Sequence, residues 1–305
     1  IPDRHIHLTT EDSRNVIFLH PRDENGHTPL FTAEWNDDFH NAAHVFATGE
    51  THAYYQDFAH QPAKNVARAL AEGFVYQGEV SPQTGQPRGV SCAVQPPQFF
   101  VDFIQNHDQT GNRAHGERLI SLAGAEKTRV LLAALLLSPH IPLLFMGEEY
   151  GETHPFLFFT DFQGALAKAV REGRAKEFAG HAGHDASVPD PNDPQTFIRS
   201  KLDWQKAASE EGKSWLRFTR NLILLRHRYI VPLLAAGGAV EGRILHAAAH
   251  ALAVSWRFPV ALNIGADPVT MPEIPGEVIF SWPERQEALT PNSIVVRFAH
   301  GEASS

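Results

Sequence analysis

The fold of this chain is decided by one stretch, Phe99-Phe100-Val101-Asp102-Phe103-Ile104, followed at once by Gln105-Asn106-His107-Asp108-Gln109-Thr110-Gly111-Asn112-Arg113. The first six residues are mostly apolar and β-prone, which predicts a strand, and the polar cluster after them ends in a glycine turn. A carboxylate and an imidazole at the end of a buried strand are costly unless they are paired or do chemical work. The stretch therefore predicts either a satisfied ion pair or a functional site at the strand end.

The same pattern, a short strand that ends in charge, recurs three more times. The predicted strands are His5–Thr10, Pro29–Trp35 and Ile141–Met146, and they run into Glu11, Asn36-Asp37-Asp38 and Gly147-Glu148-Glu149. Helical segments separate most of them, which favours parallel strands with helices outside. Functional groups at the carboxyl ends of the strands are typical of a (β/α)8 barrel. Four such strands indicate about half a barrel, an α/β fold.

Helices are predicted at four places by their apolar spacing and end signals. One begins near His40, with Asp37 or Asp38 as its cap. The others are Pro62–Glu72, Ala125–Leu137 and Lys213–Arg228, the last with Trp215, Phe218, Leu222 and Leu225 inward. The Gly- and Pro-rich stretch 78–97 predicts a long loop, a length that is usually functional or mobile. Pro189-Asp190-Pro191-Asn192-Asp193-Pro194 excludes helix and regular strand.

The chain changes character after Pro232. Five short β-prone runs separated by Gly, Pro and Asn follow, namely Ile244–His246, Leu252–Phe258, Val260–Ile264, Val278–Ser281 and Ile294–Phe298. This pattern predicts a small antiparallel β domain. The expected organisation is a partial (β/α)8 catalytic barrel over residues 1–233, with barrel strands 5–8, and a carboxyl-terminal β-sandwich domain over residues 234–305.

Composition narrows the class of protein. The chain has 305 residues, 20 Phe and a net charge of −9, enough apolar residues for a sizeable core and no Lys/Arg run to neutralise phosphates. No nucleic-acid partner is therefore expected. No membrane partner is expected either, because the apolar run Val130–Leu137 is too short to span a bilayer. The only cysteine, Cys92, excludes an intrachain disulfide and favours a cytoplasmic setting.

Several candidate residues have a plainer interpretation beside the functional one. Glu11 could be an ordinary loop or helix-terminal carboxylate, and either Glu148 or Glu149 could be a sugar contact or a salt bridge. The pairs His181/His184 and His5/His7 have the spacing of metal ligands, but no further cysteine and no HExxH motif accompany them. No metal and no cofactor are expected.

The polar cluster after Ile104 resembles the seventh-strand motif of glycoside hydrolase family 13, the α-amylase family, in Asn106-His107-Asp108. Within that family the chain is most similar to the members that release trehalose from the end of a maltooligosyl trehalose. The further motifs that carry this resemblance run through residues 7–204: Gln105–Ala114, Gly116–Leu119, Trp35–His40, Thr48–Glu50, Gly73–Gly78, Leu144–Glu149, Pro189–Pro191 and Leu202–Trp204.

The resemblance implies hydrolysis, with retention, of the α-1,4 bond beside the terminal trehalose unit. Carried over residue by residue, Glu11 matches the general acid/base and Asp108 the carboxylate that stabilises the transition state. His107 matches the imidazole that contacts sugar hydroxyls. The remaining expected substrate-binding residues are Trp35, Asp37, Asp38, Gln109 and Arg113, and the expected partner is maltooligosyl trehalose or a related α-glucan.

One part of the family pattern has no match. The family's nucleophile is an Asp in a Gly-Phe-Arg-x-Asp type motif, and no such motif occurs in residues 1–305. We expect it upstream of Ile1, which would make this chain the carboxyl-terminal half of the enzyme, inactive by itself. Two alternatives stay open: another family 13 activity, such as a branching or amylase-like enzyme, and a non-catalytic glucan-binding fragment. The sequence gives no prediction of oligomeric state.

Overall fold

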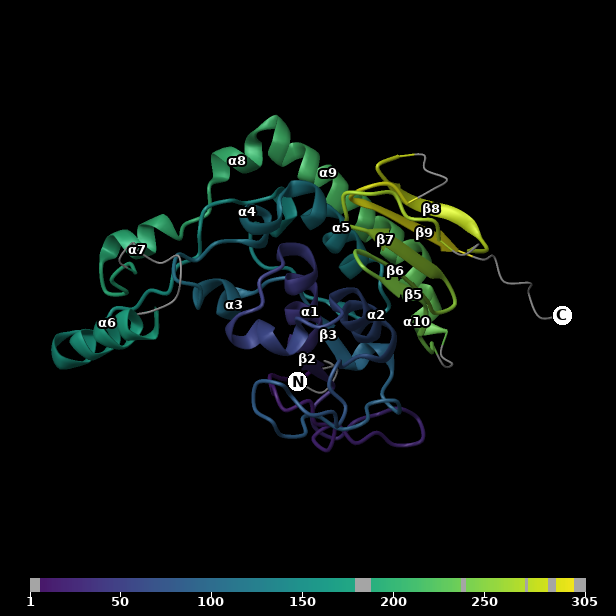
Figure 1. Cartoon of the computed structure of the whole chain (residues 1–305), viewed down its shortest axis with the longest axis horizontal. Coiled ribbons are helices and arrows are strands. Elements are labelled where there is room, and N and C mark those ends of the chain that lie inside the picture. The colour runs from purple at the N-terminus through teal and green to yellow at the C-terminus, as the bar shows by residue number, and fades with distance from the viewer. Residues whose placement is uncertain (1–5, 179–187, 237–239, 272–273, 285–288, 299–305) are drawn as a thin grey trace. The chain divides into compact units, whose positions relative to one another are not determined.

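The computed structural model describes residues 6–178, 188–236, 240–271, 274–284 and 289–298. The chain divides into two compact units. The first comprises Ile1–Ile104, Glu126–Leu143 and Arg220–Ser305, and the second comprises Gln105–Ala125 and Leu144–Thr219. Figure 1 labels their helices and strands, and each unit is described here by itself.

A parallel sheet of four strands forms the first part of the first unit. Its strands are β1 (Thr9–Thr10), β2 (Ala33–Trp35), β3 (Phe100–Asp102) and β4 (Ile141–Pro142), in the order β1-β2-β3-β4. All four predicted strands are thus confirmed, with the expected parallel pairing. They are shorter than predicted because the ladder includes only residues with a backbone partner on a neighbouring strand. Thr10 pairs with Glu34, and Glu34 pairs with Phe100.

Helices connect these strands. They are α1 (Asp37–Thr48), η1 (Ala53–Phe58), α2 (Pro62–Glu72), η2 (Pro97–Phe99) and α5 (Ala125–Leu136). The predicted cap of α1 was wrong: Asn36, and not Asp37 or Asp38, accepts the hydrogen bond from the Phe39 N–H. Asn36 still has non-helical backbone angles at the end of β2, as an N-cap residue requires, whereas the two aspartates already lie in the first turn.

A buried polar network joins the carboxyl ends of β2 and β3 to His140, the residue before β4. Asn36 Nδ2 donates to Asp102 Oδ1 over 2.8 Å and to the Gly73 carbonyl over 3.1 Å. His140 Nδ1 lies 2.7 Å from Asp102 Oδ2. Gly73, at φ +95°, is needed here, because a Cβ at this position would lie 2.0 Å from the Phe100 ring. These polar groups are therefore paired with each other, as burial requires.

The predicted helix Lys213–Arg228 is longer in the structure. It comprises α9 (Glu210–Leu225) and a π-helical turn, η4 (Arg226–Ile230), and α10 (Val231–Ala235) follows. Trp215 and Leu222 are fully buried as predicted, whereas Phe218 and Leu225 are only half-buried. Arg226 donates to the carbonyls of Leu136, Ser138 and His140 and so satisfies the carboxyl end of α5. Burial lowers the pKa of Arg226 to about 10.

An antiparallel sheet of five strands completes the first unit. Its strands are β5 (Arg243–Ala248), β6 (Ala251–Ser255), β7 (Pro259–Asn263), β8 (Glu277–Trp282) and β9 (Ser293–Phe298), in the order β5-β6-β7-β9-β8 (Figure 1). All five predicted strands are confirmed. The fold is α/β, a half-barrel type of parallel sheet followed by a small antiparallel β domain. The domain boundary at residues 233 and 234 stays a prediction.

The second unit contains short helices and long connections. The helices are α3 (His107–Gly111), α4 (Leu119–Ala123), η3 (Glu148–Tyr150), α6 (Gly164–Phe178), α7 (Pro194–Arg199) and α8 (Trp204–Ala208). The sequence analysis did not predict α6. Pro194 begins α7 behind the capping residue Asp193, since a proline is tolerated in the first turn of a helix. His5, His181 and His184 lie outside the described residues.

Candidate active site

Glu11, the expected acid/base, follows β1 directly, and its side chain is exposed in the structure. The residues on either side of it are both bound to Glu34 of β2. Thr10 Oγ1 donates to Glu34 Oε2, and the Asp12 N–H donates to Glu34 Oε1 over 2.6 Å. Thr10 Oγ1 also lies 2.8 Å from Nε2 of His20, a fully buried histidine. The segment that carries Glu11 is thus fixed by contacts on both sides.

Glu34 is a buried neighbour of the Glu11 segment that the sequence analysis did not single out. It is completely buried, and burial raises its pKa to about 7. Burial also lowers the pKa of His20, which lies 3.6 Å from the Glu34 carboxylate. The one available signal in the sequence was the acidic residue Glu34 inside the short strand Ala33-Glu34-Trp35, because an apolar residue is expected at a buried position.

Trp35, Asp37 and Asp38 lie together at the end of β2 and the start of α1. Trp35 and Asp37 are half-buried. Trp35 packs edge-on against Phe103, with 5.7 Å between the ring centroids. Contacts of these residues with a substrate stay predictions.

Asp38 has a structural role in this chain. Its carboxylate is fully buried, which raises its pKa, and it accepts hydrogen bonds from the N–H groups of Val75 and Tyr76 at 2.9 and 2.8 Å. Asn15 Nδ2 donates to the same oxygen over 2.8 Å, and Arg88 pairs with the other one. Asp38 therefore ties the Glu11–Asn15 segment to two later parts of the chain.

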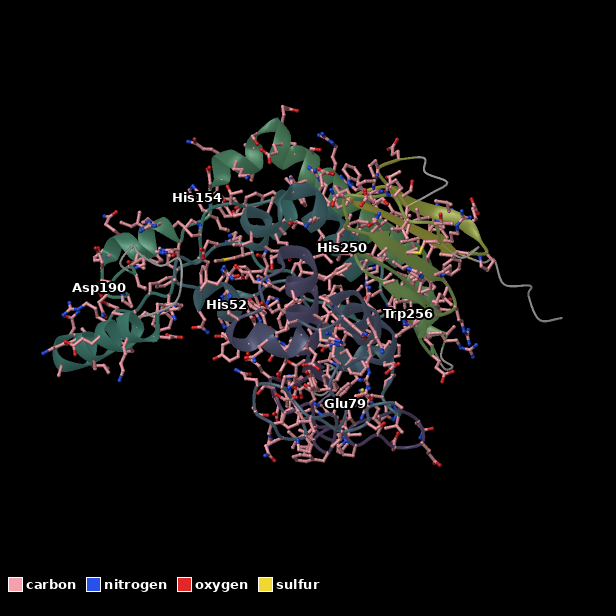
Figure 2. The ribbon with its side chains drawn as sticks, in the orientation of Figure 1. His52, Glu79, His154, Asp190, His250 and Trp256 are labelled. Carbon is pink, nitrogen blue, oxygen red and sulfur yellow. The ribbon has the colours of Figure 1, made fainter. Side chains whose placement is uncertain are left out.

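The predicted long loop 78–97 is confirmed, and Arg88 organises it. Arg88 Nε donates to the Ser13 carbonyl over 3.0 Å, and its guanidinium lies 5.1 Å from the centroid of the Tyr76 ring. At the start of the loop Glu79 (Figure 2) accepts from Arg68 over 2.6 Å. The loop residues are thus held against the segment that follows Glu11.

In the second unit, the polar cluster after Ile104 forms the short helix α3 in place of a simple turn. Asn106 caps it, and its Oδ1 accepts from the N–H groups of Asp108 and Gln109 at 2.9 and 3.0 Å. Asn112 Nδ2 donates to Asp108 Oδ1 over 2.7 Å. Asp108 and His107 are exposed. The Asn-His-Asp order therefore has a physical reason, since the asparagine orders the backbone that presents the aspartate.

The other two predicted residues of this unit lie on or beside α3. Gln109 and Arg113 are half-buried, and Arg113 pairs with Glu117 at 3.2 Å. Arg174 of α6 donates to the carbonyls of Gly111 and Arg113 at 2.8 and 2.9 Å. The structure thus places Glu11, Trp35, Asp37 and Asp38 in the first unit, and His107, Asp108, Gln109 and Arg113 in the second.

Glu148 holds a residue that directly precedes the cap of α3. It is buried, and its carboxylate accepts from Gln105 Nε2 over 3.1 Å and from the Phe145 N–H over 3.2 Å. Burial raises the pKa of Glu148 to about 8. Arg118, also fully buried, donates to the carbonyls of Met146 and His154 at 2.8 and 2.7 Å (His154 is labelled in Figure 2). Glu148 is thus a buried supporting residue rather than a surface salt bridge.

The raised pKa of Glu148 predicts a pH dependence of stability. Between its ordinary value of 4.5 and about 8, the folded state holds a proton that the unfolded state has lost, so stability falls as pH rises through this window and levels off above it. We expect this fall in the free energy of unfolding to be on the order of 3 kcal/mol, and we expect Glu148→Gln, which is neutral at every pH, to remove it. Urea unfolding of both proteins at pH 5 and pH 8.5 measures this, and equal pH slopes would contradict it.

Within the part of the chain that the structure describes, no group of three or more His, Cys, Asp or Glu is arranged to hold a metal ion. Cys92 is buried and has a free thiol, and burial raises its pKa to about 11. The chemistry that these residues offer is that of carboxylates, imidazoles and hydrogen-bonding side chains.

Comparison with known proteins shows which proteins have a similar sequence. No protein family profile matches the chain. A malto-oligosyltrehalose trehalohydrolase of Brevibacterium helvolum is 40% identical over 225 residues, which are 73% of this chain and 38% of that protein. One of Mycobacterium tuberculosis is 33% identical over 289 residues, 92% of this chain and 48% of that protein. The chain thus spans half the length of these relatives or less.

Two solved structures are also similar to this chain. The crystal structure of a protein described as a putative α-amylase from Salmonella typhimurium is 66% identical with a TM-score of 0.95, and the match covers 98% of this chain and 52% of that one. A debranching enzyme of Nostoc punctiforme matches at 14% identity with a TM-score of 0.52, over 96% of this chain and 52% of that one. The second match indicates a shared fold alone.

Proposed function

This chain belongs to the α-amylase family, with malto-oligosyltrehalose trehalohydrolases among its relatives, and we propose that it supplies the acid/base and the stabilising carboxylate of a retaining glycoside hydrolase. The proposed reaction is cleavage of the α-1,4 bond beside the terminal trehalose unit of a maltooligosyl trehalose. The observation that carries it is Glu11, exposed at the end of a parallel strand and fixed through both neighbouring residues.

In the proposed mechanism, the protonated Glu11 carboxyl gives its proton to the glycosidic oxygen as the bond from that oxygen to C1 breaks. Trehalose leaves, and a nucleophilic carboxylate bonds to C1. Glu11, now ionised, then takes a proton from water as the water oxygen displaces the nucleophile from C1. Asp108 stabilises the positive charge that develops on the sugar ring in both steps. The nucleophile is assigned to no residue of this chain.

The substrate contacts are proposed for side chains that solvent reaches. His107 would donate to sugar hydroxyls, Trp35 would stack on a sugar ring, and Asp37, Gln109 and Arg113 would bind hydroxyls near the trehalose unit. Asp38 would act on the substrate through the loop that it orders. In the described part of the chain no helix is long and apolar enough to cross a membrane. The cytoplasmic setting stays a prediction.

Product analysis tests the proposed function. The complete gene product that contains this sequence is incubated with maltotriosyl trehalose and, separately, with maltopentaose, which has the same number of glucose units but a free reducing end. We expect trehalose and maltotriose from the first substrate, and much slower cleavage of the second. New α-1,6 branches would instead support the branching enzyme, and binding without any product would support the glucan-binding fragment.

A further inference from the structure

We propose that Glu34 is a positioning residue that fixes the direction of Glu11 toward the glycosidic oxygen, an inference that rests on the proposed acid/base role of Glu11. The contacts of Glu34 are with Thr10 and Asp12, the two neighbours of Glu11. Glu34 acts through the backbone and side chain of the residues that flank Glu11.

The contact needs a planar group with two polar atoms, and the Glu34 carboxyl group supplies it. The two oxygens of Glu34 accept from different partners, the Thr10 hydroxyl on one side of Glu11 and the Asp12 N–H on the other. Glu34 itself lies in β2 between two ladder neighbours, Thr10 of β1 and Phe100 of β3, so its backbone is held in place. A rigid group that bridges residues 10 and 12 restricts the rotation of the residue between them.

Burial of this carboxyl group calls for an explanation beyond fold stability. The ion-pair partner that lies within 4 Å of Glu34 is His20, a histidine packed edge-on against Phe99 with 4.7 Å between ring centroids. Among the described residues, the acidic Asp12 and Asp37 and the cationic Arg14 also interact electrostatically with Glu34. Replacing a buried charge in such a setting by an apolar residue is often neutral or favourable for stability. A carboxyl group at this position is thus better explained by what it holds in place.

The hydrogen bonds that join His20, Thr10 and Glu34 can form in both protonation states of Glu34. When Glu34 is ionised, the Thr10 hydroxyl donates to it and accepts from His20 Nε2–H. When Glu34 is protonated, it donates to Thr10 Oγ1, and Thr10 donates to His20 Nε2. Each of these contacts can run in either direction, because a hydroxyl group both donates and accepts. The Glu11 segment is therefore held over the whole neutral pH range. This matters because Glu34, with a pKa of about 7, changes its protonation state within that range.

The test compares leaving groups, because a fluoride leaving group needs no proton from a general acid. Glu34→Leu, Glu34→Gln and Thr10→Val are made in the complete gene product, with Glu11→Gln as the reference and Glu72→Gln, an exposed partner of Arg68, as the control. We measure kcat and KM on maltotriosyl trehalose, and the burst of fluoride released from α-maltosyl fluoride.

If the Glu11 carboxyl group points in the wrong direction, kcat falls while the binding of the substrate stays nearly the same. We expect Glu34→Leu to lower kcat about 100-fold with KM within about twofold, and to lower the rate of the fluoride burst by less than about fivefold. Glu34→Gln, which can still bridge Thr10 and Asp12, should stay within about threefold of the parent on both substrates, as should Glu72→Gln. Thr10→Val removes one of the two contacts, and a loss of about tenfold on the glucan alone is expected.

Each result decides the proposal. A folded Glu34→Leu that slows both substrates equally, or slows neither, overturns it, and so does a Glu34→Gln as slow as Glu34→Leu. If Glu34→Leu does not fold, Thr10→Val decides by the same comparison. If Glu11→Gln itself shows no dependence on the leaving group, the proposed function of Glu11 fails. If Glu11→Gln shows that dependence and Glu34→Leu does not, only the positioning role fails.

Discussion

Replacing Glu11 with Gln is expected to lower kcat on maltotriosyl trehalose by about 10³-fold, within the range that a positioned general acid/base contributes. The amide has the same shape as the carboxyl group but can neither give a proton to the leaving oxygen nor take one from water. Because the side chain is exposed, the substitution leaves a packed core untouched. The free energy of unfolding should therefore stay within about 0.5 kcal/mol of that of the parent.

The measurement is initial-rate release of trehalose from the complete gene product, with urea unfolding of the same samples. Asp23→Asn is the matched control, since Asp23 is an exposed carboxylate of the same unit whose partners, Asn25 and His27, lie within its own turn. It should retain full activity. A Glu11→Gln protein with more than about a tenth of the parent kcat would remove Glu11 from the acid/base role.

The strands and the exposed candidates could be predicted because their signals are local. An apolar run that meets a charge gives a strand end, and such runs located β1 to β4 and all five strands of the antiparallel sheet. The boundaries were less accurate, because pairing with a neighbouring strand decides where a ladder stops. Glu11 and Asp108 were identified by resemblance, and the structure adds the contacts that order the segments on which they lie.

Buried carboxyl groups could not be predicted in this way. Glu34 is held by residues 24 and 22 positions earlier, and Asp38 by partners 23 positions earlier and 50 positions later. Only the three-dimensional pairing of β1 with β2, and the path of loop 78–97, bring these groups together. The same limit explains the cap of α1. From the sequence, Asn36, Asp37 and Asp38 are all good cap residues, and the end of β2 decides among them.

The largest expected effect on stability belongs to Arg88. Its ion pair with Asp38 is shielded from solvent, with 19% and 0% of the two side chains exposed, and Asp38 has no other cationic partner among the ion pairs of the described residues. Removing one member of such a pair leaves an uncompensated buried charge. We expect Arg88→Ala to lower the free energy of unfolding by about 3–5 kcal/mol, measured by urea unfolding at pH 7.5.

A pH series and a second substitution separate the charge from the packing of Arg88 on Tyr76. Burial already raises the pKa of Asp38, and without Arg88 the folded protein would hold that proton to higher pH, so the deficit should be smaller at pH 5 than at pH 8. Asp38→Asn in the Arg88→Ala background removes the buried charge and should recover part of the loss. Arg14→Ala, in an exposed pair with Asp12 whose arginine is 66% exposed, is the control and should cost less than about 1 kcal/mol. A deficit that is independent of pH and unchanged by Asp38→Asn would show that Arg88 stabilises the loop by packing alone.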